Sequence, residues 1–512
     1  MTMTRNKFPF RALLGCSVVA LLLAGCTVGP KYHPPSPTPQ APPPSYKESP
    51  TQFPEAGEWK VAQPQDAMLR GKWWEIYNDP ELNELEDKLN VNNQNIKQAF
   101  ENFMEARTLV AQARAQLYPT LSVAPTYNYS HASANLGKTV GTSSAGASST
   151  LVTLPFEASW EPDLWGKVRN TIREQQYNAQ LSAADLENER LTEQASLAVF
   201  LFELRGQDAL QKVFNETIDA DQKSVDLTRA RYETGVDDQI SLVQAENALQ
   251  SAIAAGTNLG VLRAQYEHAI AVLIGTMPSS FSIAYRPLDA VPPVIPIGVP
   301  SQLLERRPDV AASERTMAAA NAQIGIAVAA YYPNLTLTGE SGFESSLIGN
   351  LLKWPSHFWS VGPSISETIF DAGLRRATVR QFEAVYNADV AGYRQTVLSA
   401  FQQVEDNLAA VRILSKQIKE QQDAEHSAEQ YLELAKARYY TGVDTYLNVL
   451  VAQTTLLSDQ QTLASLRTQV MTASVQLIEA LGGGWDRSEL PTPAQVSGRV
   501  TKSEIETPQN PQ

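Results

Sequence analysis

The side chains that could perform catalysis are scattered along this 512-residue chain. Its histidines are His33, His131, His268, His357 and His426, and they are too widely spaced to form a usual set of metal ligands. The glycine run 482–484 lacks the lysine and the following helix of a phosphate-binding loop. Because no grouping of nucleophile, base and metal ligands is visible, we expect neither an enzyme nor a bound cofactor.

Covalent chemistry is predicted at one residue, near the N-terminus. Three basic residues precede the apolar segment 12–24, which is short for a membrane-spanning helix. The segment ends in Leu23-Ala24-Gly25-Cys26, which resembles the lipobox of bacterial lipoproteins. We expect 1–25 to be a signal peptide and Cys26 to carry a covalent lipid; the alternative is an ordinary signal peptide with an incidental cysteine. By the same resemblance, Thr27 in place of an aspartate indicates the outer membrane.

Composition limits the partners of the mature chain. Removal of the signal peptide and its three basic residues changes the formal net charge from −14 to −17, which argues against nucleic acid. An acidic surface is compatible with the passage of cations. Residues 26–64 are rich in proline and read as a lipid-anchored tether. Residues 486–512 are polar and read as a disordered C-terminal tail.

The chain contains an internal duplication. Residues 230–237 and 437–444 are identical at seven of eight positions and lie 207 residues apart. The same offset relates Gly166 to Gly373. A fixed period of this length indicates a duplicated structural unit. We therefore predict a first repeat over 65–300 and a second over 301–485.

Each repeat is expected to hold one β-hairpin and three helices. The segments 120–161 and 334–370 alternate apolar and polar residues, which is typical of barrel strands that separate lipid from a polar lumen. Two proline-free segments follow, 167–234 and 374–441, and each is long enough for a helix of about 100 Å. Return helices are predicted over 237–275 and 444–482, and one continuous helix is predicted over 81–118 in the first repeat.

Four strands per chain cannot close a barrel, and open strand edges are not tolerated in lipid. The chain must therefore form an oligomer, with eight strands from two copies or twelve from three. Strand number alone does not choose between them.

Several features together resemble the TolC-like outer-membrane factors, in particular the NodT-type efflux lipoproteins similar to OprM. These are the lipobox, the tandem repeat, Trp73-Trp74, Arg307-Pro308-Asp309 and the two Arg-Tyr-x-Thr-Gly-Val-Asp turns. The resemblance implies an α+β membrane protein: a homotrimer whose twelve-stranded β-barrel in the Gram-negative outer membrane continues into a long periplasmic α-helical barrel. It also implies a periplasmic adaptor (membrane fusion) protein and an inner-membrane pump as partners.

The function implied is an outer-membrane channel of a tripartite efflux system for drugs or other small molecules. The alternatives are the duct of a type I-like polypeptide secretion system or, less in keeping with the strands, a lipid-anchored coiled-coil scaffold without a pore. In the family, the periplasmic helix tips contact the adaptor and close the channel. The corresponding adaptor-contact residues here are Thr234, Gly235, Val236, Thr441, Gly442 and Val443. The corresponding constriction residues are Asp444, Leu447, Asn448 and Val451. Whether the constriction is acidic or hydrophobic stays open. Leu447 and Val451 have a second possible role, which is only to pack one helix against another.

Overall fold

The computed structural model describes residues 27–38, 46–48, 71–133, 148–295 and 306–498. Cys26, the predicted signal peptide and residues 499–512 lie outside these ranges. The first repeat comprises η3 (Trp73–Tyr77), α2 (Pro80–Asn92), α3 (Gln94–Ala115), β1 (Thr120–Val123), β2 (Thr126–His131), β3 (Ser148–Trp160), α4 (Lys167–Glu233), α5 (Gln239–Leu273) and η4 (Pro278–Ser280). The second comprises α7 (Pro308–Ala329), β4 (Asn334–Ser345), η5 (Ile348–Asn350), η6 (Trp354–Ser356), β5 (His357–Ser366), α8 (Leu374–Tyr440) and α9 (Tyr446–Ala480), followed by η7 (Arg487–Glu489) and α10 (Pro493–Val496).

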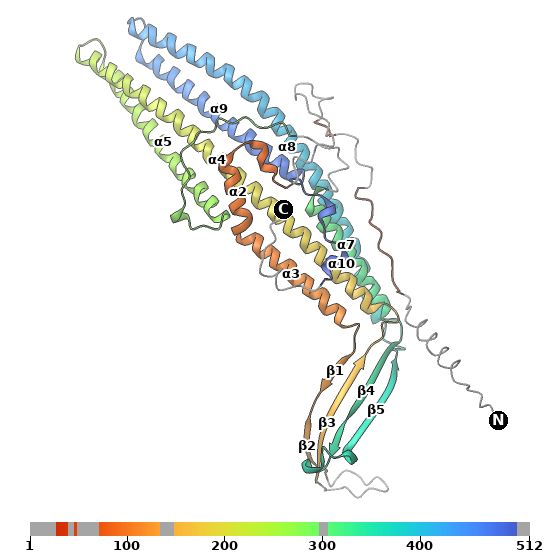
Figure 1. Cartoon of the computed structure of the whole chain (residues 1–512). Helices are drawn as coiled ribbons and strands as arrows, with labels where there is room; N and C mark the ends of the chain where they lie inside the picture. Colours follow the sequence, from red (N-terminus) through yellow and green to blue (C-terminus); the bar gives the residue numbers. More distant parts are fainter. Residues whose placement is uncertain (1–26, 39–45, 49–70, 134–147, 296–305, 499–512) are drawn as a thin grey trace, which may run out of the picture.

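The molecule is a long rod with a β-sheet at one end and two helical tips at the other (Figure 1). The helices α4 and α8 have 67 residues each, so each is about 100 Å long. Helix α4 packs against α5 and α9, and α9 packs against α8. No described helix combines the length and the apolar character needed to cross a lipid bilayer.

The sheet is antiparallel, with β3 between β1/β2 and β4, and β5 beyond β4. Both β1 and β2 pair with β3, so together they occupy the place of one strand. The predicted alternation is kept in register: Leu121 lies opposite Ala158, and Leu335 lies opposite Ile365 on the apolar face. On the polar face Glu157 lies directly opposite Glu340. The outer strands β1/β2 and β5 each have an unpaired edge within one chain, where neighbouring copies can pair.

The expected single helix over 81–118 is wrong, because the chain breaks into α2 and α3 at Asn93. The Asn93 side chain accepts hydrogen bonds from the backbone nitrogens of Asn95 and Ile96 at 2.8 and 3.0 Å, so it caps α3. Its Nδ2 also donates to the backbone oxygen of Leu273 at 3.0 Å. At the matching place in the second repeat, Arg307 Nη1 donates to the backbone oxygen of Ala480 at 3.0 Å.

Both described terminal segments pack on the helical body. Tyr46 is buried in the main core cluster, and Val28 N donates to the backbone oxygen of Trp165 at 3.0 Å. At the other end, Val496 of α10 is only 1% exposed, and Arg114 Nη1 donates to the backbone oxygen of Ser497 at 2.8 Å. The expectation of a disordered tail is therefore wrong for residues 486–498, because an apolar side chain and a helix cap hold them in place.

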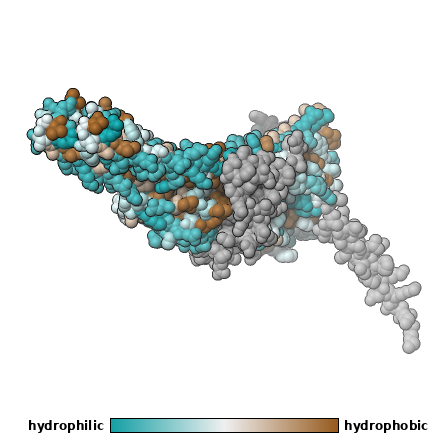
Figure 2. Space-filling view, turned by 90° about the horizontal axis from the view of Figure 1, so that it is seen from above, coloured by the Kyte–Doolittle hydropathy of each residue, from teal (hydrophilic) through white to brown (hydrophobic). Residues whose placement is uncertain are grey.

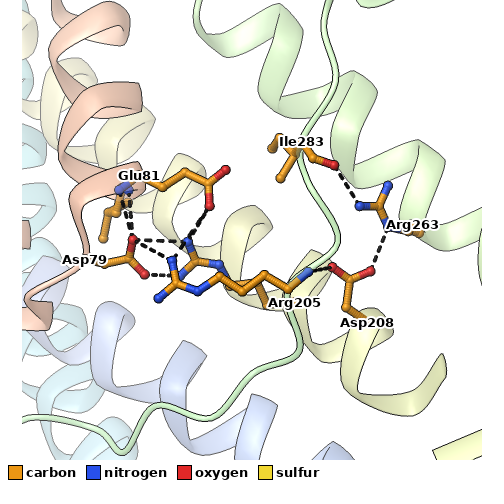
Figure 3. A network of polar contacts seen from close by, with 8 residues as sticks. Asp79, Glu81, Arg205, Asp208, Arg263 and Ile283 are labelled. Atoms are coloured by element: carbon orange, nitrogen blue, oxygen red, sulfur yellow. Dashed lines mark hydrogen bonds and ion pairs between the residues drawn. The ribbon is translucent and has the colours of Figure 1, made fainter. Parts of the chain in front are cut away.

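A network of charged residues holds the first repeat together where α2, α4 and α5 meet (Figure 3). Arg205 of α4 forms ion pairs with Asp79 and Glu81. Burial opposes the charged form of Asp79, but the hydrogen bond and charge of Arg205 leave the pKa of Asp79 below its ordinary value. Beside this pair, Arg263 Nε of α5 donates to Asp208 Oδ1 of α4 at 2.7 Å. The base of the α4–α5 pair is therefore fixed by buried ion pairs.

Candidate functional site

The turn between α4 and α5 contains three of the predicted adaptor-contact residues. Gly235 has φ +74°, a backbone conformation that favours glycine. Its N–H donates to the backbone oxygen of Tyr232 at 3.0 Å, and Val236 N donates to that of Arg231 at 2.8 Å. These two hydrogen bonds form a Schellman motif that ends α4. Thr234 adds a side-chain hydrogen bond to the backbone oxygen of Ala230 at 2.9 Å.

The turn between α8 and α9 repeats this geometry. Gly442 has φ +73°, and its N–H donates to the backbone oxygen of Tyr439 at 3.0 Å. Val443 N donates to that of Arg438 at 3.0 Å, and Thr441 Oγ1 donates to that of Ala437 at 3.1 Å. A Cβ atom added at Gly235 or Gly442 would meet nothing within 4 Å. The glycines are therefore needed for their backbone conformation and not to make space.

A cluster of three side chains links the two turns. Arg231 Nε donates to Asp237 Oδ2 at 2.9 Å, and the Tyr439 hydroxyl donates to the same carboxylate. The Arg231 guanidinium also lies over the Tyr439 ring, 4.7 Å from its centroid. Burial, reinforced by the hydrogen bond to Asp237, raises the pKa of Tyr439 well above its ordinary value. We call Arg231, Asp237 and Tyr439 the tip latch, because it joins the α4–α5 pair to α8.

Neither Asp237 nor Tyr439 is among the adaptor-contact and constriction residues that the sequence predicted. Arg231 and Tyr439 lie within the two repeated octapeptides, which could have marked them as candidates. Tyr232 occupies the position in the first repeat that matches Tyr439, but it is 41% exposed. Equivalent residues of the duplication therefore differ in environment, which the local sequence does not reveal.

The predicted constriction residues lie in the second turn and the first turns of α9. Asp444 accepts a hydrogen bond from Thr445 N at 2.9 Å, and its other contacts are with Asn448 and Arg438. Hydrogen bonds, first from the Thr445 backbone and then from Asn448, lower the pKa of Asp444. Asp444 is therefore ionised at neutral pH, and Asn448 is held against it.

Leu447 and Val451 do not pack inside the chain. They are 50% and 47% exposed, whereas Tyr446 and Val449 beside them are 2% and 3% exposed. Val443 at the second turn is 66% exposed. Apolar side chains accordingly stand out among polar ones at the tip end of the molecule (Figure 2, left). Within one chain, Leu447 and Val451 are thus free to meet other copies or to line an opening.

A small apolar cluster supports both turns from below. It combines side chains of all four tip helices, including Val225 of α4, Ala245 of α5, Leu432 of α8 and Val449 of α9. Asp221 is 5% exposed, and burial raises the pKa of its carboxyl to about 6. The turns therefore lie above an apolar core shared by the four tip helices, and the buried carboxyl of Asp221 lies beside that core, near Tyr446.

Among the residues described, no group of three or more His, Cys, Asp or Glu side chains is arranged to hold a metal ion. The tip offers instead ion pairs, hydrogen-bonded turns and exposed apolar side chains. This arrangement can hold helices together or release them.

Comparison with known proteins identifies the family. The model of the outer membrane efflux protein family matches residues 85–276 and 299–483. The efflux pump outer membrane protein TtgC of Pseudomonas putida is 32% identical over 479 residues, which cover 93% of this chain and 96% of TtgC. OprJ of Pseudomonas aeruginosa is 31% identical over 497 residues, which cover 94% of this chain and 97% of OprJ.

Solved structures agree with the sequence relatives. The outer-membrane channel OprN superposes with a TM-score of 0.81 at 26% identity, covering 90% of this chain and 100% of that one. The open state of the MtrE outer membrane channel of Neisseria gonorrhoeae gives a TM-score of 0.77 at 26% identity, covering 90% and 99%. The predicted fold class is confirmed: three copies form a twelve-stranded barrel that continues into a helical barrel.

The location and the partners follow from the family. The predicted location is confirmed: the protein lies in the Gram-negative outer membrane, and its helices extend into the periplasm. The predicted partners are confirmed at the level of the family: two further copies of the chain, a periplasmic adaptor and an inner-membrane pump. The chain belongs to the outer membrane efflux protein family and is the outer-membrane channel of an efflux system.

Proposed function

We propose that the helix tips form a gate at the periplasmic end of this channel, closed at rest and opened by an adaptor. The observation that carries the proposal is the tip latch, which joins the α4–α5 pair to α8 through Asp237. Breaking it removes the polar link between the α4–α5 pair and α8 at the turns and leaves the apolar cluster below as the contact between the two helix pairs. A latch placed where three copies converge controls the width of the opening.

The constriction is formed by side chains of α9. Leu447 and Val451 are half exposed on one chain, and three copies would place six apolar side chains around the axis. Such a ring can close a pore by excluding water. Asp444 adds negative charge near the entrance but is held by Arg438 and Asn448. The seal is therefore mainly apolar, with an acidic rim.

The adaptor binds the two turns. Val236 and Val443 are 62% and 66% exposed and lie beside Gly235 and Gly442, whose Cα atoms present no side chain. Two equivalent apolar knobs, one per repeat, give a trimer six matching contact points. Because the two turns have the same backbone geometry, an adaptor segment that binds one turn can also bind the other.

The cargo is small organic molecules, and the chain transports them without bond chemistry or a cofactor. Relatives are named for toluene efflux and antibiotic efflux. Cys26 carries the lipid that holds the N-terminus at the membrane. Anchoring of this kind requires more than one acyl chain to be stable.

Single-channel conductance of the purified trimer in a planar bilayer tests the gate. Wild type is compared with Leu447→Gly/Val451→Gly, and Leu434→Gly serves as a control on α8, where the side chain is 66% exposed. We expect small wild-type currents that rise strongly in the double variant only. Large wild-type currents that the double variant leaves unchanged would place the closure elsewhere.

A further inference from the structure

A cavity of about 270 Å³ lies where the sheet joins the helical body. It is lined by three connections: 161–167 between β3 and α4, 329–335 between α7 and β4, and 366–368 after β5. Trp165 stacks on Tyr332, with ring centroids 4.8 Å apart and planes inclined by 24°. Trp165 Nε1 also donates to the backbone oxygen of Pro333 at 2.8 Å. One wall of the cavity is therefore a fixed aromatic pair.

The cavity presents charges of both signs to a ligand. Lys167 Nζ lies 3.7 Å from Glu161 Oε1, which is longer than a hydrogen bond, and the two side chains are 53% and 36% exposed. Glu367 adds a second carboxylate to the lining. Asp163 is engaged instead by Arg169, whose Nε donates to it at 2.9 Å. The lining thus presents one ammonium group and two carboxylates to a ligand, and the ammonium forms only a long ion pair with Glu161.

The cavity lies at the level of the periplasmic membrane surface. Its connections are at the end of the sheet from which the helices begin (Figure 1). Leu335 in its lining belongs to the apolar face of the sheet, where it pairs with Ile365. Tryptophan and tyrosine concentrate at this depth in membrane proteins. The N-terminal segment reaches the same loop, because a Cβ atom added at Gly166 would lie 2.6 Å from Thr27 Cγ2.

We propose that this cavity binds the headgroup of a phospholipid that carries a phosphate and a primary ammonium, as phosphatidylethanolamine does. Lys167 pairs with the phosphate, and Glu161 and Glu367 accept hydrogen bonds from the ammonium. The acyl chains follow the apolar face that begins at Leu335. A volume of 270 Å³ equals roughly nine waters of liquid, enough for one such headgroup. The site fixes the height of the sheet in the membrane and acts independently of the tip gate.

Native mass spectrometry of the delipidated trimer in detergent tests this site. The trimer is titrated with phosphatidylethanolamine, phosphatidylcholine and phosphatidylglycerol that have identical acyl chains. We expect phosphatidylethanolamine to be retained at least about tenfold better than phosphatidylcholine, because a quaternary ammonium cannot donate hydrogen bonds to carboxylates. Free phosphoethanolamine should bind far more weakly, because it has no chains to cover Leu335.

The variant Glu161→Gln/Glu367→Gln should lose the preference for phosphatidylethanolamine over phosphatidylcholine while remaining a trimer. Glu420→Gln/Glu433→Gln on α8 is the matched control and should bind like wild type, because these side chains are 66% and 75% exposed outside the cavity. Equal retention of all three lipids by wild type would overturn the proposal, even if the double variant fails to assemble. So would a double variant that binds like wild type, or free phosphoethanolamine that binds as well as the lipid.

Discussion

The tip latch makes a sharp prediction for Tyr439→Phe. The Tyr439 ring is 3% exposed, lies under the Arg231 guanidinium and contacts the Tyr446 ring at 5.6 Å between centroids. Phenylalanine keeps these ring contacts and removes only the hydroxyl that donates to Asp237. The substitution therefore weakens the link between the α4–α5 pair and α8 without leaving a cavity.

The size of the effect follows from the chemistry of the lost contact. A hydrogen bond to a charged group contributes about 1.5–3 kcal/mol. Removing it lowers the ratio of closed to open tips by roughly 10- to 150-fold per chain, because each 1.4 kcal/mol is a factor of ten. If the three copies open together, the effect on the trimer exceeds roughly a thousandfold. A gate that is shut at rest then opens measurably.

Single-channel recording in a planar bilayer measures this change as open probability. We expect Tyr439→Phe to raise it strongly and Asp237→Asn, which also weakens the pairing with Arg231, to raise it further. Tyr440→Phe is the control, since that neighbouring ring is 56% exposed. If Tyr439→Phe conducts like wild type while its trimer remains intact, the latch does not hold the gate.

Three further predictions concern the core below the tips, the lumen and the second turn. Because burial raises the pKa of Asp221 to about 6, its charge destabilises the folded tips as pH rises from about 4 to above 6, by at most about 3 kcal/mol. Hydrogen exchange of tip peptides should therefore quicken between pH 5 and 7.5 after correction for the intrinsic rate, and Asp221→Asn should abolish this change. Glu157→Gln/Glu340→Gln should lower the cation preference in reversal-potential measurements, because these paired carboxylates lie on the polar face of the sheet; an unchanged preference would place the selective charges elsewhere. Gly442→Ala should weaken the second turn by about 1–2 kcal/mol through its positive φ and speed exchange in that peptide, whereas Gly392→Ala in mid-helix should not.

The long helices could be predicted from the sequence almost to the residue. The prediction of 167–234 compares with Lys167–Glu233 in the structure, and that of 374–441 with Leu374–Tyr440. Each segment lacks proline and lies between glycines that have positive φ, such as Gly166 and Gly235. Where the sequence signals for the start and end of a helix are this strong, tertiary contacts change the helix boundaries very little.

The break at Asn93 could not be predicted in the same way, because neither proline nor glycine marks it. An asparagine cap was available in the sequence, but what selects it is tertiary: Nδ2 of Asn93 donates to Glu193 Oε2 and to the backbone oxygen of Leu273, both at 3.0 Å. The same holds for residues 486–498, where a polar composition suggested disorder and burial of Val496 decided otherwise.

The contacts of the tip latch could not be predicted from the sequence for a related reason. Asp237 and Tyr439 lie 202 residues apart, and their meeting depends on the side-by-side packing of the two repeats. Duplication predicts equivalent turns, yet the two turns must differ once they pack against each other. Tyr232 is exposed and Tyr439 is buried for this reason.

The central claim, that the tips of three copies converge and close the channel, is tested most directly by cross-linking at Val451. With the signal peptide removed and Cys26 lipidated, Val451→Cys would carry the single free thiol of the mature chain. We predict that a short bis-maleimide joins copies into covalent dimers in membranes, and that adding Asp237→Asn to the same chain reduces the yield. Chains that stay monomeric on denaturing gels, although native mass shows an intact trimer, would contradict the convergence of the tips.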